Sequence, residues 1–268
     1  MDSLGDRMKS YEFRETRRQF LPGVPVVARI DGRAFSRFTR GMARPYDSDF
    51  MAVMHDVTRA LVQETDARIG YTQSDEISLV FENATPDTQL FFDGKVQKMC
   101  SVLAAYATAR FMPRALALWP ERAAATPPHF DCRVFQVPNR EEAANCVLWR
   151  ELDATKNAIS MAARAHFSHK RLHAKSGAEM QEMLWQEAGI NFNDYAPAFK
   201  RGAFFQRRKR LRHFSDAELA RIPEPHRPTG PVARTEIAHL EMPRFSQVAN
   251  RTAVIFDGAP PEVFIPRN

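Results

Sequence analysis

Hydrophobic and polar positions early in the chain change from a strand pattern to a helix pattern. Residues 24–30 form a short, β-branched run that stops at Asp31-Gly32, which predicts a buried strand followed by a turn. Apolar side chains then recur at helical spacing between residues 47 and 66. This spacing predicts an amphipathic helix that lays one face against a core.

Two apolar runs, 68–73 and 77–81, flank Ser74-Asp75-Glu76 and predict a hairpin with carboxylates at its tip. The later elements are a helix from about residue 96, a strand at 133–137 and an alanine-rich helix from about 140 toward 166. The order strand, helix, strand, strand, helix, strand indicates an α+β fold of the split βαβ type. This is a ferredoxin-like antiparallel sheet of four strands with two helices on one face.

The chain divides into two expected parts, a sheet domain over residues 1–138 and a helical, basic C-terminal portion over 139–268 packed on it. In the second part we expect a helix over 177–188, and four prolines between 223 and 231 predict a stiff linker. No element is predicted for the tail after about residue 222.

Composition adds a basic bias to this picture. The 268 residues carry a net charge of +6, which favours a polyanionic partner. Three scattered cysteines without a CxxC pair support neither a disulfide framework nor a cysteine zinc site. No apolar run approaches the roughly 20 residues of a membrane span, and the N-terminus is too polar for a secretory signal, so we expect a cytoplasmic protein with no membrane partner.

The basic residues concentrate in one run, FKRGAFFQRRKRLRHF at residues 199–214. Lysine and arginine bind phosphates and phenylalanine stacks on bases, so this run is typical of an RNA-binding surface. A strand edge protected by charge would look the same. The candidate RNA contacts are Lys200, Arg201, Arg207, Arg208, Lys209 and Arg210.

Three acids carry the candidate chemistry: Asp31 after the first strand, and Asp75 and Glu76 at the hairpin tip. Taken alone, Asp31-Gly32 is better interpreted as an ordinary turn and Asp75-Glu76 equally as a polar hairpin tip, so neither motif predicts a site by itself. In a split βαβ sheet, however, both positions lie in the same sheet, so the acids can converge. Converging carboxylates are stabilised by cations, and two magnesium ions (Mg2+) would clamp a phosphoryl transfer there.

The residues around the acids suit a nucleoside triphosphate. Gly32 permits a close backbone approach and Ser74 supplies a hydroxyl. Lys95 and Lys98 lie near the start of the second helix, where phosphate could rest on the helix N-terminus, and Arg44 could add charge from its loop.

Three histidines, His166, His169 and His173, have a spacing that a continuous helix would place on one face. A zinc site is one interpretation. Because the segment is basic and breaks before Gly177, we favour a solvated or RNA-facing surface.

Two long segments resemble the acidic motifs of the tRNA-His guanylyltransferase family. They are ARIDGRAFSRF at 28–38 and YTQSDEISLVF at 71–81. Shorter matches follow in the family's order: MARPYD at 42–47, FDCRVFQV at 130–137, Trp149-Arg150, and FKRG at 199–202. The resemblance covers roughly residues 14–205. It implies a polymerase-like palm, tRNA as partner, and a homotetramer.

The resemblance also implies an activity, 3′–5′ nucleotidyl transfer to the 5′ end of tRNA after ATP or GTP activates the 5′ phosphate. It makes Asp31, the Gly32 carbonyl and Asp75 metal ligands, and it includes Glu76 among the catalytic acids. The implied nucleotide contacts are Asp31, Gly32, Arg33, Ala34, Phe35, Ser36, Arg44, Ser74, Asp75, Lys95, Lys98 and Asn157.

Two departures from the family pattern bear on the substrate. Ser36 stands where eukaryotic members have histidine, and TKNAISM at 155–161 replaces their His-Ile-Asn-Asn-Leu-Tyr-Asn motif. We therefore favour template-directed repair of tRNA 5′ ends over addition of the extra guanosine to tRNA-His. A palm-type nucleotide cyclase and an RNA-binding protein with a degenerate palm are the alternatives from other classes.

Overall fold

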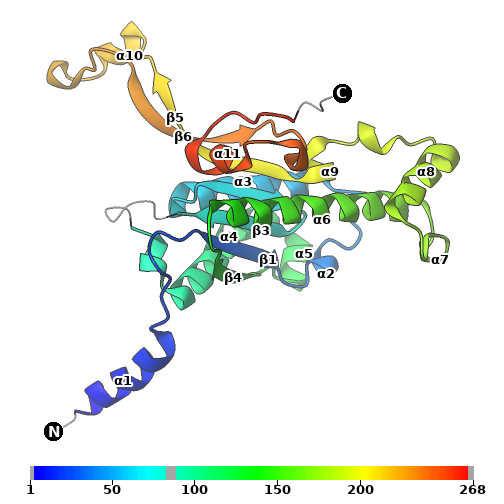
Figure 1. Cartoon of the computed structure of the whole chain (residues 1–268), viewed down its shortest axis with the longest axis horizontal. Coiled ribbons are helices and arrows are strands. Elements are labelled where there is room, and N and C mark those ends of the chain that lie inside the picture. Colours follow the sequence, from blue (N-terminus) through cyan, green and yellow to red (C-terminus); the bar gives the residue numbers. More distant parts are fainter. Residues whose placement is uncertain (1–2, 83–88, 265–268) are drawn as a thin grey trace.

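The computed structural model describes residues 3–82 and 89–264 and contains one six-stranded sheet (Figure 1). The strands are β1 (Val26–Gly32), β2 (Ile69–Gln73), β3 (Glu76–Phe81), β4 (Phe130–Gln136), β5 (Ala203–Arg212) and β6 (Val232–Leu240). Their order in the sheet is β4-β1-β3-β2-β5-β6, and every neighbouring pair is antiparallel. The α+β class and the predicted hairpin are confirmed.

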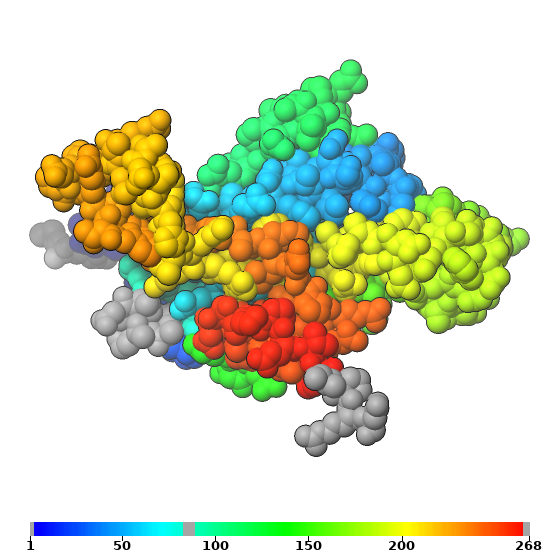
Figure 2. Space-filling view, turned by 90° about the horizontal axis from the view of Figure 1, so that it is seen from above, coloured from blue at the N-terminus to red at the C-terminus, as the bar shows by residue number. Residues whose placement is uncertain are grey.

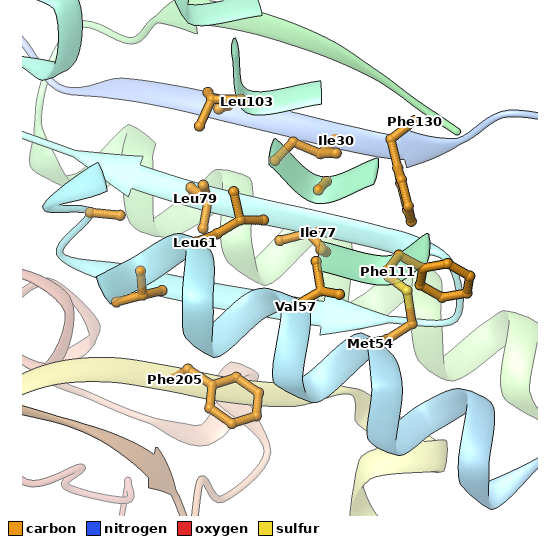
Figure 3. Close-up of a cluster of buried hydrophobic side chains, with 14 of the residues drawn as sticks. Ile30, Met54, Val57, Leu61, Ile77, Leu79, Leu103, Phe111, Phe130 and Phe205 are labelled. Atoms are coloured by element: carbon orange, nitrogen blue, oxygen red, sulfur yellow. The ribbon is translucent and has the colours of Figure 1, made fainter. Parts of the chain in front are cut away.

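Two long helices, α3 (Ser48–Thr65) and α4 (Val96–Leu118), cover one face of the sheet, as predicted. Ile30 and Ile77 of the sheet pack there against Met54 of α3 and Phe111 of α4 (Figure 3). Because side chains alternate along a strand, Val27 points to the opposite face. That face is covered by α6 (Arg140–His166) and α11 (Arg251–Asp257).

The sheet is larger than the predicted four strands, since β5 and β6 join it beyond residue 138. The buried start of β5, Ala203–Gln206, pairs with β2, whereas residues 207–212 pair only with β6. The two strands leave the sheet as an arm, which forms a separate yellow-to-orange lobe in Figure 2. The division of the chain at residue 138 stays a prediction.

The prolines at 223–231, predicted to form a stiff linker, join two strands of the same sheet. They lie in the connection between the paired strands β5 and β6, which also holds α10 (Asp216–Ala220) and a short 3-10 turn at Glu224–His226. Proline lacks a backbone donor and therefore suits the connection better than the strands. We name residues 207–236 the basic arm.

The remaining helices are α1 (Leu4–Thr16), α2 (Phe35–Phe38), α5 (Pro120–Ala125), α7 (His169–Leu172), α8 (Gly177–Ala188) and α9 (Pro197–Arg201). Further short 3-10 turns lie at Phe91–Gly94, Phe192–Asp194 and Phe245–Gln247. The helices predicted at 140–166 and 177–188 are both present. None of the helices in the described ranges is both long and apolar enough to cross a membrane.

Candidate active site

The sheet brings the three acids together, at the end of β1 and at the turn between β2 and β3. Asp31 on β1 lies opposite Glu76 on β3 in the strand register. The turn between β2 and β3 consists of Ser74 and Asp75, with Ser74 in the left-handed region at φ 54°. The Gly32 N–H donates to the Asp75 carbonyl at 3.1 Å and fixes the hairpin tip against the end of β1. Residues far apart in sequence thus form one acidic site.

Burial and charge both act on Asp75. Desolvation raises the pKa of its carboxyl to about 6, the Ser74 hydroxyl that donates to Oδ1 at 3.1 Å opposes this shift, and the nearby Asp31 adds to it. A carboxylate that is partly buried beside a like charge favours either a proton or a cation. The site therefore presents the electrostatic conditions of a cation site.

The donor set fits magnesium. Asp31, Asp75 and the Gly32 carbonyl offer only hard oxygen atoms, which magnesium prefers. Within residues 3–82 and 89–264, no group of three histidine, cysteine or acidic side chains is placed to bind a metal. An ion held by two carboxylates keeps positions open for water and substrate phosphate, which is the usual magnesium arrangement at phosphoryl-transfer sites.

Glu76 is held by an arginine rather than left free at the site. Arg150 of α6 donates from Nε and Nη2 to the two Glu76 oxygens, at 2.5 and 2.9 Å, and Arg29 Nε lies 3.9 Å away. Burial raises the pKa of Glu76, and the Arg150 guanidinium opposes that shift. Because both carboxylate oxygens accept from Arg150, Glu76 positions α6 beside Asp31 and Asp75.

The same helix carries Asn157 toward the site. Arg150 Nη2 also donates to Asp153 at 3.1 Å, and the Asn157 amide donates to the same Asp153 carboxylate at 3.3 Å. Asn157 is exposed one helical turn beyond Asp153. Asn157 does not line the cavity beside the hairpin tip, which α6 reaches one and two turns later, at Met161 and Arg164.

The segment after β1 forms a loop that can receive phosphate. Ala34 adopts a left-handed conformation at φ 58°, and among the described residues the N–H groups of Ala34, Phe35 and Ser36 donate to no protein acceptor. Consecutive free N–H groups form an anion-binding concavity. The Arg33 N–H is engaged, since it donates to His129 at 2.9 Å.

Phe35 itself anchors this loop and does not line the site. Its ring is 2% exposed and packs against four other aromatic rings, those of Phe38, Phe50, Phe111 and Phe130. A Cβ on Gly32 would meet the Phe35 ring at 2.5 Å, so glycine is required where the loop folds over it. A nucleotide would contact the backbone of Phe35 only.

A cavity of about 310 Å³ opens beside the hairpin tip, a volume that suits a nucleoside. Ser36, Arg44 and Ser74, all expected from the sequence, line it. Asp47, the N-cap of α3, and Arg164 of α6 line it too, although sequence reasoning did not select them. The cavity adjoins the free N–H groups, so a bound triphosphate could reach the acids.

Comparison with known proteins agrees with this geometry. A family model described as tRNAHis guanylyltransferase matches residues 5–138. The chain is also 34% identical to a solved bacterial tRNA-His guanylyltransferase-like protein in complex with ATP, with a TM-score of 0.76 over 91% of this chain and 94% of that one.

The chain belongs to the tRNA-His guanylyltransferase family.

Other relatives support the assignment. A second bacterial tRNA-His guanylyltransferase-like structure, in complex with GTP, is 33% identical with a TM-score of 0.70, over 91% of this chain and 94% of that chain. The tRNA(His) guanylyltransferase of Saccharomyces cerevisiae is 26% identical over 217 residues, which cover 75% of this chain and 90% of the relative. As a member of this family the protein is a nucleotidyltransferase.

The structure does not bring Lys95 and Lys98 to the site. The Val96 N–H donates to the Arg18 carbonyl, in the segment that leads into β1, at 3.0 Å. The Thr108 hydroxyl accepts from the Phe130 N–H, at the acid end of β4, at 3.1 Å. The helix α4 therefore begins at the far end of the sheet, and 13 residues of helix separate Lys95 from the acid end by roughly 20 Å. Within one chain, both lysines lie too far away to hold a triphosphate over the acids.

Two of the six proposed RNA contacts, Lys200 and Arg207, have structural roles instead. Lys200 is 9% exposed, and its ammonium donates to the Asn193 carbonyl. Arg207 donates to the last turn of α3, at 2.7 Å to Val62 O, and forms an ion pair with Asp66 at 3.1 Å.

The other four candidate RNA contacts differ in exposure. Arg201 is half-buried at the end of α9. The next residue, Gly202, must be glycine because its φ is 77° and a Cβ there would lie 2.6 Å from Thr72 O. Arg208 is half-buried, and its Nε donates to Gln206. Lys209 and Arg210 are exposed on the basic arm.

The three histidines do not share a helix. The helix α6 ends at His166, α7 begins at His169, and His173 follows α7. The His169 and His173 rings are 6.5 Å apart, and the described residues place no third ligand there. The zinc interpretation has no support.

Arg29 and Arg150 are the contacts to Glu76 that sequence reasoning missed. For Arg29 a signal existed, because it lies two residues before Asp31 in a strand and therefore on the same face. Arg150 has no such signal beyond the family-like dipeptide Trp149-Arg150, because its contact with Glu76 depends on how α6 packs on the sheet.

Proposed function

We propose that this protein adds nucleotides in the 3′–5′ direction to the 5′ end of tRNA, and that it repairs truncated ends against the opposite strand. The observation that carries the proposal is the convergence of Asp31 and Asp75 beside a nucleoside-sized cavity. Magnesium as the ion, ATP and GTP as substrates, and a cytoplasmic homotetramer as the working form belong to the same proposal. The ion and the tetramer rest on family resemblance, and the substrates also on the neighbours solved with ATP and with GTP. The cytoplasmic location rests on the polar N-terminal sequence and the lack of a long apolar run.

The protein's own groups divide the work of nucleotidyl transfer. The cavity holds the nucleoside, and the free N–H groups of Ala34 to Ser36 bind its phosphates. Asp31 and Asp75 would hold magnesium, which neutralises phosphate charge and activates the attacking hydroxyl. Glu76 and Arg150 keep α6 beside the acids. The fold supplies position and electrostatic stabilisation, with no covalent nucleophile.

Template-directed repair is favoured over tRNA-His maturation by residues of α6 and the cavity. The segment 155–161 of α6 keeps Asn157 but little else of the eukaryotic motif, and its last residue, Met161, lines the cavity. Ser36, in place of the eukaryotic histidine, lines the cavity. The higher identity to the bacterial guanylyltransferase-like protein than to the Saccharomyces cerevisiae structure, 34% against 25%, supports the same choice.

The test compares two substrates with purified protein, magnesium, ATP and labelled GTP. One is a full-length tRNA-His, and the other is a 5′-monophosphorylated tRNA that lacks its first paired nucleotide. Repair predicts labelling chiefly of the truncated tRNA, with the nucleotide set by the base opposite and the signal lost in Asp75→Ala. Labelling chiefly of tRNA-His would establish guanosine addition instead, and a cyclic nucleotide without labelled RNA would establish a cyclase.

A further inference from the structure

Trp149 on α6 is an exposed aromatic residue beside the catalytic acids. Its side chain is 51% exposed, although two arginines flank the ring. The Arg150 guanidinium carbon lies 4.6 Å from the ring centroid, and that of Arg29 lies 5.7 Å from it. Both arginines also meet Glu76, so the indole is fixed relative to the site while much of its surface stays open.

The sheet next to this indole is uncovered. Arg29 and Asp31 share the strand face on which α6 packs, and the register continues that row onto β4 as Arg133 and Asp131. Along β4 the residues on this face, Asp131, Arg133 and Phe135, are exposed. The helix α6 therefore leaves the β4 edge open, and Trp149 borders this open face.

The nucleoside cavity opens on a different flank of the acids. Its walls come from the loop of Ser36, the start of α3, the hairpin tip, the later part of α6, and α9, and neither Trp149 nor Arg29 lines it. Nucleotidyl transfer needs two substrates at the acids. If a triphosphate occupies the cavity, the RNA end must approach from the open β4 side.

We propose that Trp149 is the stacking platform for the terminal nucleobase at the 5′ end of the RNA substrate, with Arg29 and Arg150 holding the indole in place. This inference rests on the proposed function and names the contact that positions the RNA end. Indole stacks on any base, which suits an enzyme that must accept different terminal nucleotides. Arg133, exposed beside Asp131, adds a cation for the adjoining phosphate.

The experiment measures binding without triphosphate, so that no extension occurs. The RNA is a 5′-monophosphorylated acceptor-stem hairpin, made either with its 5′-terminal base or with an abasic sugar at that position. Loss of one stacked base weakens RNA binding about 5- to 150-fold. We expect this loss in Trp149→Ala on the intact hairpin, near wild-type binding in Trp149→Phe, and no further loss in Trp149→Ala on the abasic hairpin.

The control is Trp185→Ala, because Trp185 is equally exposed at 55% but lies on α8 and makes no cation–π contact in the described part of the chain. An equal loss of binding affinity for Trp149→Ala on the intact and the abasic hairpin would overturn the proposal that Trp149 stacks on the terminal base. A change in oligomeric state with unchanged RNA binding would overturn it too and assign the face to a protein interface. Wild-type extension of the same hairpin tests the proposed function separately, since binding is measured without turnover.

Discussion

The ion pair between Arg150 and Glu76 is expected to stabilise the fold and to shape the site. Its side chains are 15% and 17% exposed, and the pair is bidentate. Replacing Arg150 by methionine leaves a buried carboxylate with only Arg29, 3.9 Å away, to balance it. Breaking a buried pair costs about 3–5 kcal/mol, and because Arg29 remains we expect a value near the lower limit, about 3 kcal/mol.

This loss can be converted into a melting temperature. An unfolding entropy of about 2.1 cal/mol/K per residue gives about 0.56 kcal/mol/K for 268 residues, so Arg150→Met should lower Tm by about 5 °C. Urea denaturation followed by circular dichroism measures the free energy directly. The double variant Arg150→Met/Glu76→Gln removes the unpaired charge and should recover a large part of the loss, with a coupling of about 1–3 kcal/mol.

The pH dependence gives an independent check. Burial already raises the pKa of Glu76, and loss of Arg150 raises it further. The folded protein then binds a proton that the unfolded chain releases, so the deficit of Arg150→Met should be largest at pH 8 and shrink as the pH falls. A double variant as unstable as the sum of its singles, or a deficit independent of pH, would refute this account of the pair.

The remaining predictions concern the site and the basic arm. Asp31→Ala and Asp75→Ala should each abolish turnover and leave tRNA binding largely intact in a filter-binding assay; wild-type rates would contradict the metal site. Burial raises the pKa of Asp75 to about 6, so the folded state keeps its proton at pH values where the unfolded chain has lost it. Without metal, the free energy of unfolding should therefore fall as the pH rises from the ordinary aspartate range to about 6. Urea unfolding of Asp75→Asn should show no such fall over this pH range. Replacing Lys209 and Arg210 by glutamine should weaken tRNA binding and reduce its logarithmic salt slope by about 2, and an unchanged slope would remove the arm from the RNA surface. Lys95→Ala should leave the KM for the triphosphate within about twofold if one chain forms the site.

The elements that could be predicted from sequence are those with a clear periodic pattern. The helix at 48–65, the hairpin around Ser74 and Asp75, and the strand before Asp31 each combine apolar periodicity with a turn signal. Once these elements were ordered as a split βαβ unit, the convergence of Asp31 and Asp75 followed from topology alone.

The strands β5 and β6 could not be predicted because their pattern is mixed. Only the first four residues of β5 are buried, and the charged residues of the arm pair with β6 without a core to face. A strand that is stabilised by pairing with its partner rather than by burial shows no alternation of apolar and polar residues. Its charged sequence therefore resembles that of a solvated loop. The prolines in the connection strengthened that wrong interpretation.

The position of Lys95 and Lys98 depends on the direction of α4, which follows from the topology of the sheet and not from the local sequence pattern. A positive side chain at a helix N-terminus suits phosphate wherever the helix points, but only one end of the sheet has the acids. Since β4 must begin beside Gly32 to pair antiparallel with β1, the chain that precedes β4 must end its helix at the acid side and begin it at the other. The antiparallel register of β4 therefore also places both lysines at the end of the sheet away from the acids. The same reasoning brings α6, which follows β4, back toward the acids and explains why Arg150 and Trp149 lie there.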